Sequence, residues 1–443
     1  MILLFQYSIS LNLKNDKIIL YKIIMAKKSV KKEGALPDPF EMLKSIDDKV
    51  EIIEESAYSN IEDWIPTGNY LLNAAISGSL FGGIPSGRTS TLVGESGCGK
   101  SYLACSIARE AQKKGYACLY LDSEGAIDSD FVTRLGVDSS KLIIRQVNTI
   151  LETSQLILNL CEKLEKQEEE YGKHQKWCIF LDSLGNLTSD TERNNVLAGE
   201  NKAELKKPQE IKKMFRTCTV PLARMGCPFV VISHVYDSMN MFSPGKTVSG
   251  GSGINYNSSV TLEMSASKLA DKENDAAASK VSNSEDVART GVLVTARPKK
   301  SRFTISRKVR FQIPYFKKPN PYIGLECYLN WDNGGVCRGA LITEKDYNKM
   351  SDKEKESIHV FDFNGETKYV QEKDTARNII VKHLGAAVPV TEFFTDKVFT
   401  EDYLKEIDEN VIKPAFKLPD QSAFDDIKEI EDMIEVGEEP NDD

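Results

Sequence analysis

The apolar residues in the middle of the chain form short β-rich runs that alternate with longer stretches of helical spacing. The clearest runs predict strands at Thr89–Val93, Cys118–Leu121, Trp177–Leu181 and Phe229–Ser233. Each is a nearly continuous apolar run, which is typical of a strand buried on both faces of a parallel sheet. Because these strands alternate with helical patterns, the sequence predicts an α/β fold with a mostly parallel central sheet.

Three later β-rich runs extend this pattern. They span Ser258–Met264, Thr290–Ala296 and Val309–Ile313, and we expect them to form an antiparallel extension of the same sheet. Between the first two, Ser265–Ala288 is rich in Ala, Ser, Asn, Asp and Lys, a composition that predicts a flexible surface segment.

The two ends of the chain differ from this core. Pro39–Ala57 has apolar residues spaced by three or four, which predicts a short amphipathic helix. From about residue 336 the chain is more polar, and a weak amphipathic pattern over residues 375–412 indicates a small mixed domain. We therefore expect an N-terminal extension (1–24), an N-terminal helical arm (25–63), the core (64–335), a small mixed C-terminal domain (336–417) and an acidic tail (418–443).

The first 24 residues are left out of the fold prediction. They are apolar but interrupted by charged residues, and Met25-Ala-Lys-Lys resembles a second, more typical start. They are expected to be either an upstream extension from a misassigned start codon or a disordered segment. No stretch reaches the roughly 20 apolar residues of a membrane helix. We therefore expect a cytoplasmic protein without membrane contact, in the bacterial host cytoplasm if the source is a phage.

The charge is distributed unevenly. The composition, 41% hydrophobic and 28% charged, is ordinary and makes collagen, coiled-coil and wholly disordered chains unlikely. Asp425–Asp443 contains ten acidic residues and one lysine, a sum of −9 that equals the net charge of the whole chain. The rest of the chain is therefore neutral, and the overall acidity does not argue against an anionic partner for the core.

The nine cysteines do not form a metal-binding pattern. No two have C-x-x-C spacing, and the four histidines lie far from any such pair, so a clustered zinc site is not predicted. We expect buried free thiols in a reducing cytoplasm.

The strongest chemical signal lies between the strand Thr89–Val93 and a helix expected from Tyr102 to Gln112. It matches the G-x-x-x-x-G-K-[ST] motif and reads Gly94-Glu95-Ser96-Gly97-Cys98-Gly99-Lys100-Ser101. Glycines let successive backbone N–H groups face a phosphate, and the helix N-terminus adds favourable partial charge. Lys100 is expected to contact the β- and γ-phosphates and Ser101 to bind Mg²⁺. The sequence therefore predicts binding of a nucleoside triphosphate.

Two acidic residues follow later strands. Asp182 ends the strand Trp177–Leu181, and a carboxylate at the end of a strand neighbouring the phosphate loop is placed to hold Mg²⁺ through water. Glu124 follows the strand Cys118–Leu121 and is placed to orient or deprotonate an attacking water. By spacing alone Glu124 is one of many surface acids, and Asp182 could simply cap its strand.

The order of these motifs resembles the RecA-type recombinases, and within them the UvsX branch of the T-even phages. The resemblance covers about residues 64–330, with a weaker similarity to 417. It is carried by the phosphate loop, "LDSEGAID", "IFLDSLGNL", "VVISH" and "GKTVSGGSGINY", of which "DSLGNL" and "MFSPGKTVSGGSG" are the most specific pieces. It implies a RecA-type P-loop NTPase, a DNA-dependent ATPase using ATP and Mg²⁺. It also implies a helical filament on single-stranded DNA that exchanges strands with a homologous duplex in recombination, repair and recombination-dependent replication.

The resemblance implies roles for residues near the phosphate loop. Glu124 matches the catalytic base or water-positioning glutamate, and Asp128 and Phe131 match positions that contact adenine. His234 matches the glutamine with which bacterial RecA senses the γ-phosphate, and the UvsX branch also has histidine there. Phe131 and His234 could instead be ordinary core residues.

A basic cluster, Arg297–Arg302, implies a further contact. Lys300 and Arg302 match two lysines that reach the nucleotide of a neighbouring subunit in bacterial RecA. Arginine keeps the charge but changes the geometry. The alternative is a patch that binds DNA phosphates.

Two further segments match DNA-binding loops. Tyr236–Gly253 corresponds to the second loop of the family, and its glycines and apolar residues suit contacts to phosphates and bases, although a plain connector remains open. The first loop is expected within Thr188–Lys207, where a solvated face would look the same. The candidate DNA contacts are Phe242, Lys246, Gly250, Gly251, Gly253 and Arg193.

The remaining expectations concern partners and alternatives. The N-terminal helix is implied to dock on the adjacent subunit, and a single-strand-binding protein and a loading mediator are implied as partners. The acidic tail could compete with DNA for basic surface or serve only solubility. A ring-shaped helicase is disfavoured because only about 60 residues precede the core. A non-catalytic paralogue is disfavoured because Lys100, Ser101, Glu124 and Asp182 are all present.

Overall fold

The computed structural model describes residues 38–47, 50–53, 56, 60–125, 127–199, 206–237, 246–248, 257–269, 291–315 and 318–418. The chain divides into two units, Met1–Ser56 and Ala57–Asp443, and each is described by itself. Within the described ranges no helix is long and apolar enough to cross a membrane. The predictions for residues 1–24, for the acidic tail beyond residue 418 and for most of the segment Ser265–Ala288 lie outside the described residues.

The first unit contains one described helix, α2 (Pro39–Lys44), which is shorter than predicted. Asp38 caps it by accepting a hydrogen bond from the Phe40 amide (2.8 Å), and Pro39 occupies the first turn. No residue of α2 is buried. The expected helix over Pro39–Ala57 is therefore wrong in length: it ends at Lys44, because a helix without a packed face gains no tertiary stabilisation beyond its caps.

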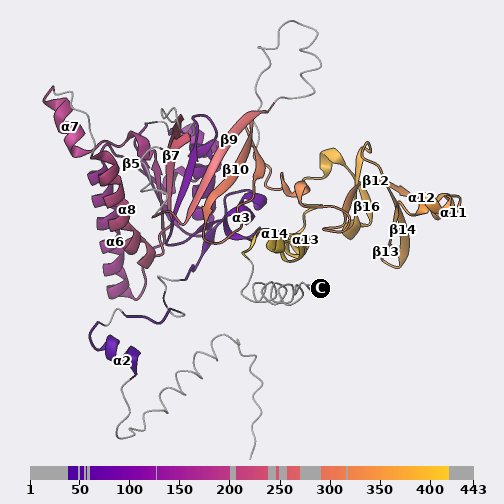
Figure 1. The fold of residues 1–443 in the computed structure, drawn as a ribbon, viewed down its shortest axis with the longest axis horizontal. Helices are drawn as coiled ribbons and strands as arrows, with labels where there is room; N and C mark the ends of the chain where they lie inside the picture. Colours follow the sequence, from indigo (N-terminus) through magenta and orange to yellow (C-terminus); the bar gives the residue numbers. More distant parts are fainter. Residues whose placement is uncertain are drawn as a thin grey trace, which may run out of the picture. The chain divides into compact units, whose positions relative to one another are not determined.

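The second unit is built on a nine-stranded sheet with the order β11-β10-β9-β3-β7-β6-β4-β5, in which β8 also pairs with β7 (Figure 1). The strands are β3 (Thr89–Gly94), β4 (Ala117–Asp122), β5 (Leu142–Gln146), β6 (Trp177–Asp182), β7 (Phe229–Asp237), β8 (Lys246–Val248), β9 (Val260–Leu269), β10 (Gly291–Ser301) and β11 (Val309–Pro314). Strands β3, β4, β5, β6, β7 and β9 run parallel, whereas β8, β10 and β11 are antiparallel. The predicted α/β fold with a mostly parallel sheet is confirmed.

Two details of the sheet differ from the prediction. Strand β9 pairs parallel with β3, so the antiparallel extension begins only at β10, and β9 continues to Leu269 into the segment expected to be flexible. Strand β7 lies between β3 and β6, so Asp182 ends a strand one place removed from the phosphate-loop strand rather than its neighbour. Crossover connections can skip a position in a parallel sheet, and the order of strands along the chain does not reveal this.

The central strands are buried on both faces, as their continuous apolar runs predict. In β4, Cys118 and Tyr120 belong to the cluster formed with α3 and α4, whereas Leu119 and Leu121 pack with α6 and α8. Figure 1 shows α6 and α8 side by side on one face of the sheet. The helices concerned are α3 (Tyr70–Ser77), α4 (Lys100–Lys113), α6 (Ile150–Tyr171) and α8 (Lys207–Arg224).

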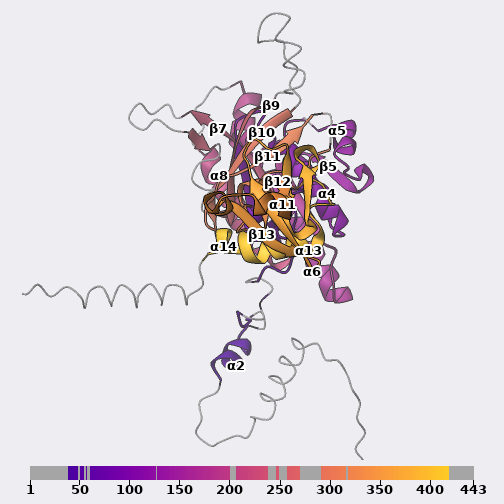
Figure 2. The same ribbon diagram turned by 90° about the vertical axis from the view of Figure 1, so that its right-hand side faces the viewer.

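A second, five-stranded antiparallel sheet follows, with the order β13-β14-β12-β15-β16 (Figure 2). Its strands are β12 (Val336–Ile342), β13 (Ile358–Phe363), β14 (Glu366–Glu372), β15 (Asn378–Val381) and β16 (Ala386–Pro389), with helices α11 (Glu344–Asn348), α12 (Asp352–Lys355), α13 (Glu401–Ile407) and α14 (Lys413–Phe416). The buried carboxylate of Asp408 accepts hydrogen bonds from the Ser79 hydroxyl (2.7 Å) and the Leu80 amide (2.6 Å). This carboxylate bonds the C-terminal helical segment to the loop that follows α3.

All nine cysteines are free. Eight are buried, as the sequence predicts, and Cys327 is exposed. Burial raises the pKa of Cys118 to about 12, which keeps this thiol protonated and unreactive at neutral pH.

Candidate active site

The phosphate loop joins β3 to α4 and curls around its lysine. Lys100 is only 5% exposed, and its ammonium donates hydrogen bonds to the carbonyl oxygens of Gly94 (2.9 Å) and Glu95 (2.7 Å). A Cβ at Gly94 would lie 2.4 Å from the carbonyl oxygen of Met264 in β9, so this position requires glycine. Gly99 caps α4 in a left-handed conformation (φ 91°), which also favours glycine. The loop therefore has the geometry that the motif predicts.

The N-terminus of α4 is suited to bind an anion. Its cap, Gly99, supplies no side-chain hydrogen bond, so the first amides of the 14-residue helix have no capping side chain. Such amides carry a partial positive charge and bind phosphate groups. The exposed part of the loop consists of Glu95, Ser96 and Gly97. Cys98 is buried, and its Sγ lies 3.9 Å from Nζ of Lys100.

Asp182 lies next to Ser101, the last residue of the phosphate-loop motif. Asp182 is 2% exposed, accepts a hydrogen bond from the Tyr120 hydroxyl (2.7 Å) and is hydrogen-bonded to the Ser101 hydroxyl. Burial raises the pKa of the Asp182 carboxyl, the negative charges of Glu124 and Asp122 add to this, and the two hydroxyl hydrogen bonds only partly offset it. A hydroxyl and a carboxylate are hard oxygen ligands of the kind Mg²⁺ prefers, so this pair fits the predicted metal site.

Glu124 follows β4 and is held by donors from two other strands. The Ser183 hydroxyl after β6 and Nε2 of His234 in β7 (3.0 Å) both donate hydrogen bonds to the same oxygen, Oε1. Burial alone would raise the pKa of this carboxyl, but these two hydrogen bonds and the charges of His234 and Lys100 outweigh it, so the pKa is lowered. Glu124 is therefore ionised at neutral pH, although its side chain is only 24% exposed.

The strand register explains why these residues meet. Gly94 at the end of β3 is the direct partner of His234 in β7, and Asp122 at the end of β4 is the direct partner of Asp182 in β6. The carboxyl ends of parallel strands meet at one edge of a sheet, which is where ligands bind in α/β folds. The structure thus brings Lys100, Ser101, Glu124, Asp182 and His234 to one edge.

The two residues expected near adenine lie on α5 (Ser129–Arg134). Asp128 is its exposed N-cap and accepts a hydrogen bond from the Phe131 amide (2.7 Å). The Phe131 ring is partly buried and packs against the main hydrophobic core, which is the alternative that the sequence left open. Adenine contact by either residue stays a prediction.

Lys300 and Arg302 lie at the opposite edge of the sheet. Along the β3–β9–β10 register, Gly94 is level with Met264 and Ala296, whereas Ser301 is level with Val260 and Ser90 at the start of β3. Ser90 lies four residues before Gly94 in β3, which corresponds to about 13 Å along the strand. The basic cluster therefore lies toward the ends of the strands opposite the phosphate loop.

The second predicted DNA loop begins as a β-ribbon. Strand β7 continues to Asp237 and pairs antiparallel with β8, so that Asp237 lies opposite Lys246. Of the candidate contacts in this segment, only Lys246 lies within the described residues. The others in this segment, Phe242, Gly250, Gly251 and Gly253, lie outside them.

The segment in which the first DNA loop is predicted, Thr188–Lys207, contains a helix, and DNA contact there stays a prediction. Helix α7 (Asp190–Leu197) occupies much of Thr188–Lys207, with Ser189 as its N-cap. Arg193 is exposed on α7, and Leu197 at its end is 77% exposed. Lys207 donates a hydrogen bond to the Gly185 carbonyl (2.8 Å), so its charge is partly used within the protein.

Sequence reasoning missed Asp122, Ser123 and Ser183. Asp122 accepts hydrogen bonds from the amides of Glu124 (2.9 Å) and Gly125 (2.8 Å), and the Ser123 hydroxyl donates to the Ser183 carbonyl (2.7 Å). A signal existed, since β4 and β6 both end in Leu-Asp-Ser. Matching endings on two adjacent parallel strands place like residues side by side.

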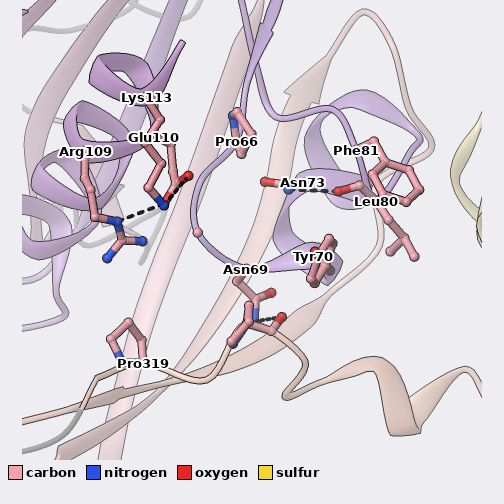
Figure 3. A pocket seen from close by; sticks show the side chains of 12 residues that line it. Pro66, Asn69, Tyr70, Asn73, Leu80, Phe81, Arg109, Glu110, Lys113 and Pro319 are labelled. Atoms are coloured by element: carbon pink, nitrogen blue, oxygen red, sulfur yellow. Dashed lines mark hydrogen bonds and ion pairs between the residues drawn. The ribbon is translucent and has the colours of Figure 1, made fainter. Parts of the chain in front are cut away.

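A separate pocket of about 370 Å³ lies between α3 and the second half of α4 (Figure 3). One wall carries Glu110, which accepts hydrogen bonds from Arg109 (2.8 Å) and Lys113 (2.8 Å), and the other carries Tyr70 and Phe81. Arg109 is nine residues beyond Lys100, or about 14 Å along the helix. This pocket is therefore distinct from the phosphate loop.

Comparison with known proteins identifies the family. The model of the RecA N-terminal domain family matches residues 47–292. The "Recombination and repair protein" of Enterobacteria phage T4 is 30% identical over 198 residues, which are 44% of this chain and 48% of that protein. "Protein RecA" of Bartonella quintana is 30% identical over 205 residues, 45% of this chain and 54% of that protein. The chain thus spans about half the length of the curated relatives it matches. Because the family model covers more than half of the chain, this protein belongs to the RecA N-terminal domain family.

Proposed function

We propose that this protein is an ATP-dependent DNA recombinase. It assembles as a helical filament on single-stranded DNA, pairs that strand with a homologous duplex and exchanges strands in recombination, repair and recombination-dependent replication. The names of the two relatives, "Recombination and repair protein" and "Protein RecA", support this proposal. Base pairing reads the sequence in such a reaction, so the protein needs mainly backbone contacts.

The observation that carries the proposal is the hydrogen bond between His234 and Glu124. His234 lies on β7 only two residues before Tyr236, where the predicted DNA loop begins, and its ring nitrogen is 3.0 Å from the Glu124 carboxylate. Strand β7 therefore carries both the hydrogen-bond donor to the proposed hydrolytic carboxylate and the start of the predicted DNA-binding segment. A shift of His234 on DNA binding would move or release Glu124, which is a physical route to DNA-dependent hydrolysis.

The residues of the phosphate loop have separable tasks in this proposal. Amides of the loop and of the α4 N-terminus bind the triphosphate, and Lys100 neutralises charge on its β- and γ-phosphates. Ser101 and Asp182 would hold Mg²⁺, which supplies charge neutralisation and orientation of the phosphates. Glu124 orients the attacking water and accepts its proton.

The basic cluster supplies the link to assembly. Lys300 and Arg302 lie toward the sheet edge opposite the phosphate loop, a position from which they would act on the nucleotide of a neighbouring subunit. Stacking subunits edge to edge would place these cations beside the γ-phosphate of the neighbour. Hydrolysis would then require a filament, and a filament would require ATP.

The remaining parts have auxiliary roles. The segment that contains α2 is the arm that docks on the adjacent subunit, and the exposed Met42 and Leu43 (51% and 48%) leave it an apolar face for that purpose. A single-strand-binding protein and a loading mediator are the further partners that we propose.

Electron microscopy of the purified protein with single-stranded DNA and a slowly hydrolysed ATP analogue tests the proposal. Continuous helical filaments that coat the DNA are expected, followed by strand exchange with a homologous duplex. Closed rings threaded on the strand would overturn the proposal in favour of a translocating helicase. Bare DNA under conditions where the nucleotide binds would also overturn it.

A further inference from the structure

The two hydrogen-bond donors to Glu124 use the same oxygen. Both the Ser183 hydroxyl and His234 Nε2 donate to Oε1, and no described residue donates to Oε2. A carboxylate that is held through one oxygen presents the lone pairs of the other in a fixed direction. We propose that Ser183 is a positioning residue that turns Oε2 of Glu124 toward the attacking water. This inference rests on the proposed ATPase function and adds a residue to it.

The backbone around Ser183 is fixed, which gives its hydroxyl a defined direction. Ser183 is fully buried (0% exposed), its amide donates a hydrogen bond to the Ser123 hydroxyl (2.8 Å), and its carbonyl accepts one from that hydroxyl (2.7 Å). The Ser123 amide in turn donates to the Asp182 carbonyl (2.8 Å). The ends of β4 and β6 are thus bonded together on both sides of Ser183.

The backbone of Glu124 is fixed separately. The buried carboxylate of Asp122 accepts the amides of both Glu124 (2.9 Å) and Gly125 (2.8 Å) through one oxygen. The freedom that remains is rotation of the Glu124 side chain, which its two donors restrict. His234 belongs to the strand that leads to the predicted DNA segment, whereas Ser183 is hydrogen-bonded to Ser123 at the end of β4. Ser183 therefore holds Glu124 even when His234 moves.

Removing the Ser183 hydroxyl should affect the reaction more than nucleotide binding. Without this hydroxyl, Glu124 would keep only the hydrogen bond from His234, and its carboxylate could rotate so that Oε1 and Oε2 change places. Oε2 would then face the attacking water less often. The loss of one charge-assisted hydrogen bond predicts that kcat falls by about tenfold. The KM for ATP should stay within about twofold, because the Ser183 hydroxyl donates its hydrogen bond to Glu124 rather than to the phosphate loop.

The test is a double-mutant cycle on single-stranded-DNA-dependent ATP hydrolysis, measured with enzyme in excess so that slow variants can be quantified. Ser183→Ala is compared in the wild-type and Glu124→Gln backgrounds. The tenfold loss should appear in the first and vanish in the second, because the hydroxyl acts only through Glu124. Ser106→Ala is the matched control: it removes a buried hydroxyl that is bonded to the Thr67 carbonyl (2.8 Å), away from Glu124, and should leave kcat unchanged.

Each outcome separates this inference from the proposed function. If the wild-type protein does not hydrolyse ATP with DNA, the proposed function fails. If it does, and Ser183→Ala equals wild type or loses activity equally in both backgrounds, only the role of Ser183 is overturned. A raised KM with an unchanged kcat would overturn it as well.

Discussion

The two edges of the nine-stranded sheet carry opposite chemistry. The carboxyl edge holds the phosphate loop together with Glu124, Asp182 and Asp122, whereas the opposite edge holds Lys300 and Arg302. Between Arg297 and Arg310 the chain has seven lysines and arginines and no acidic residue. Neither edge alone provides the balance of charge that a nucleoside triphosphate and its metal require. The contrast supports the proposal that the nucleotide site is divided between two faces of the protein.

The pKa shifts describe the same contrast. Burial raises the pKa of Asp182 and nearby acids add to this, while burial lowers the pKa of Lys300 and the charge of Arg302 adds to that. In both places like charges crowd together in a partly desolvated site. A cation beside Asp182 would relieve the crowding of negative charge there, and a bound Mg²⁺ has this property.

Removing Lys100 from the carboxyl edge should cause the largest loss of ATP hydrolysis. Lys100→Ala deletes the buried ammonium inside the phosphate loop, so we expect ATP hydrolysis to fall on the order of 10³-fold, as for loss of a preorganised charge donor. The measurement is DNA-dependent ATPase activity, with the thermal unfolding midpoint as a control for folding. Retained hydrolysis would show that the triphosphate is bound elsewhere, and the comparison between the edges would lose its basis.

The sequence predicted the carboxyl edge better than anything else in the molecule. The strand-loop-helix context of the phosphate motif and the apolar runs that end in Asp122 and Asp182 are local signals, and the structure reproduces them. The sequence could not predict which of these residues lie close together in the fold. Glu124 and His234 are 110 residues apart, and only the register between strands brings them to 3.0 Å. The contact of Ser183 with Glu124 depends on the same register.

Other regions were predicted less well for physical reasons. Strand β5 was missed because it is a short edge strand whose apolar Ile143 and Ile144 are about half exposed and lie beside charged residues. The five-stranded sheet was predicted only as a mixed domain, since an antiparallel sheet with a small core lacks long apolar runs. The helix over Pro39–Ala57 was overestimated because its pattern describes a face that needs a partner. Local patterns thus predict buried elements more accurately than exposed ones.

Neutralising the acid of the carboxyl edge should have the next largest effect. Glu124→Gln keeps the size and the hydrogen-bonding shape but removes the base, so kcat should fall on the order of 10²-fold, as for loss of a general base. Binding of a labelled ATP analogue should be unchanged, because Glu124 is not part of the phosphate loop. If binding fell together with kcat, Glu124 would belong to the nucleotide pocket itself rather than to the water site.

The opposite edge should matter for hydrolysis only when subunits are stacked. The double substitution Lys300→Ala with Arg302→Ala should lower DNA-dependent hydrolysis about 10- to 50-fold, which corresponds to about 1.4–2.3 kcal/mol, close to the contribution of one hydrogen bond to a charged group. Lys299→Ala is the matched control: this lysine is adjacent but forms an ion pair with Glu263 (2.7 Å), and its loss should change hydrolysis little.

Mixing two impaired variants sharpens this prediction. The double variant has an intact phosphate loop, and Lys100→Ala has an intact basic edge. If each site is shared, mixed filaments should recover part of the wild-type rate. No recovery on mixing, together with weaker DNA binding by the double variant, would assign the basic edge to DNA phosphates instead.

The smallest effect concerns the acidic tail and the basic edge. If Asp425–Asp443 competes with DNA for the cations between Arg297 and Arg310, deleting it should raise affinity for single-stranded DNA on the order of fivefold at low salt. The gain should shrink as salt rises, because screening weakens both the competition and DNA binding. Fluorescence anisotropy over a salt titration measures this, and a tail of equal length with its acids replaced by Asn and Gln should behave like the deletion. Affinity that is unchanged at every salt concentration would leave the tail a role in solubility alone. A gain that persists undiminished in the Lys300→Ala, Arg302→Ala background would mean that the tail acts on other cations than these two.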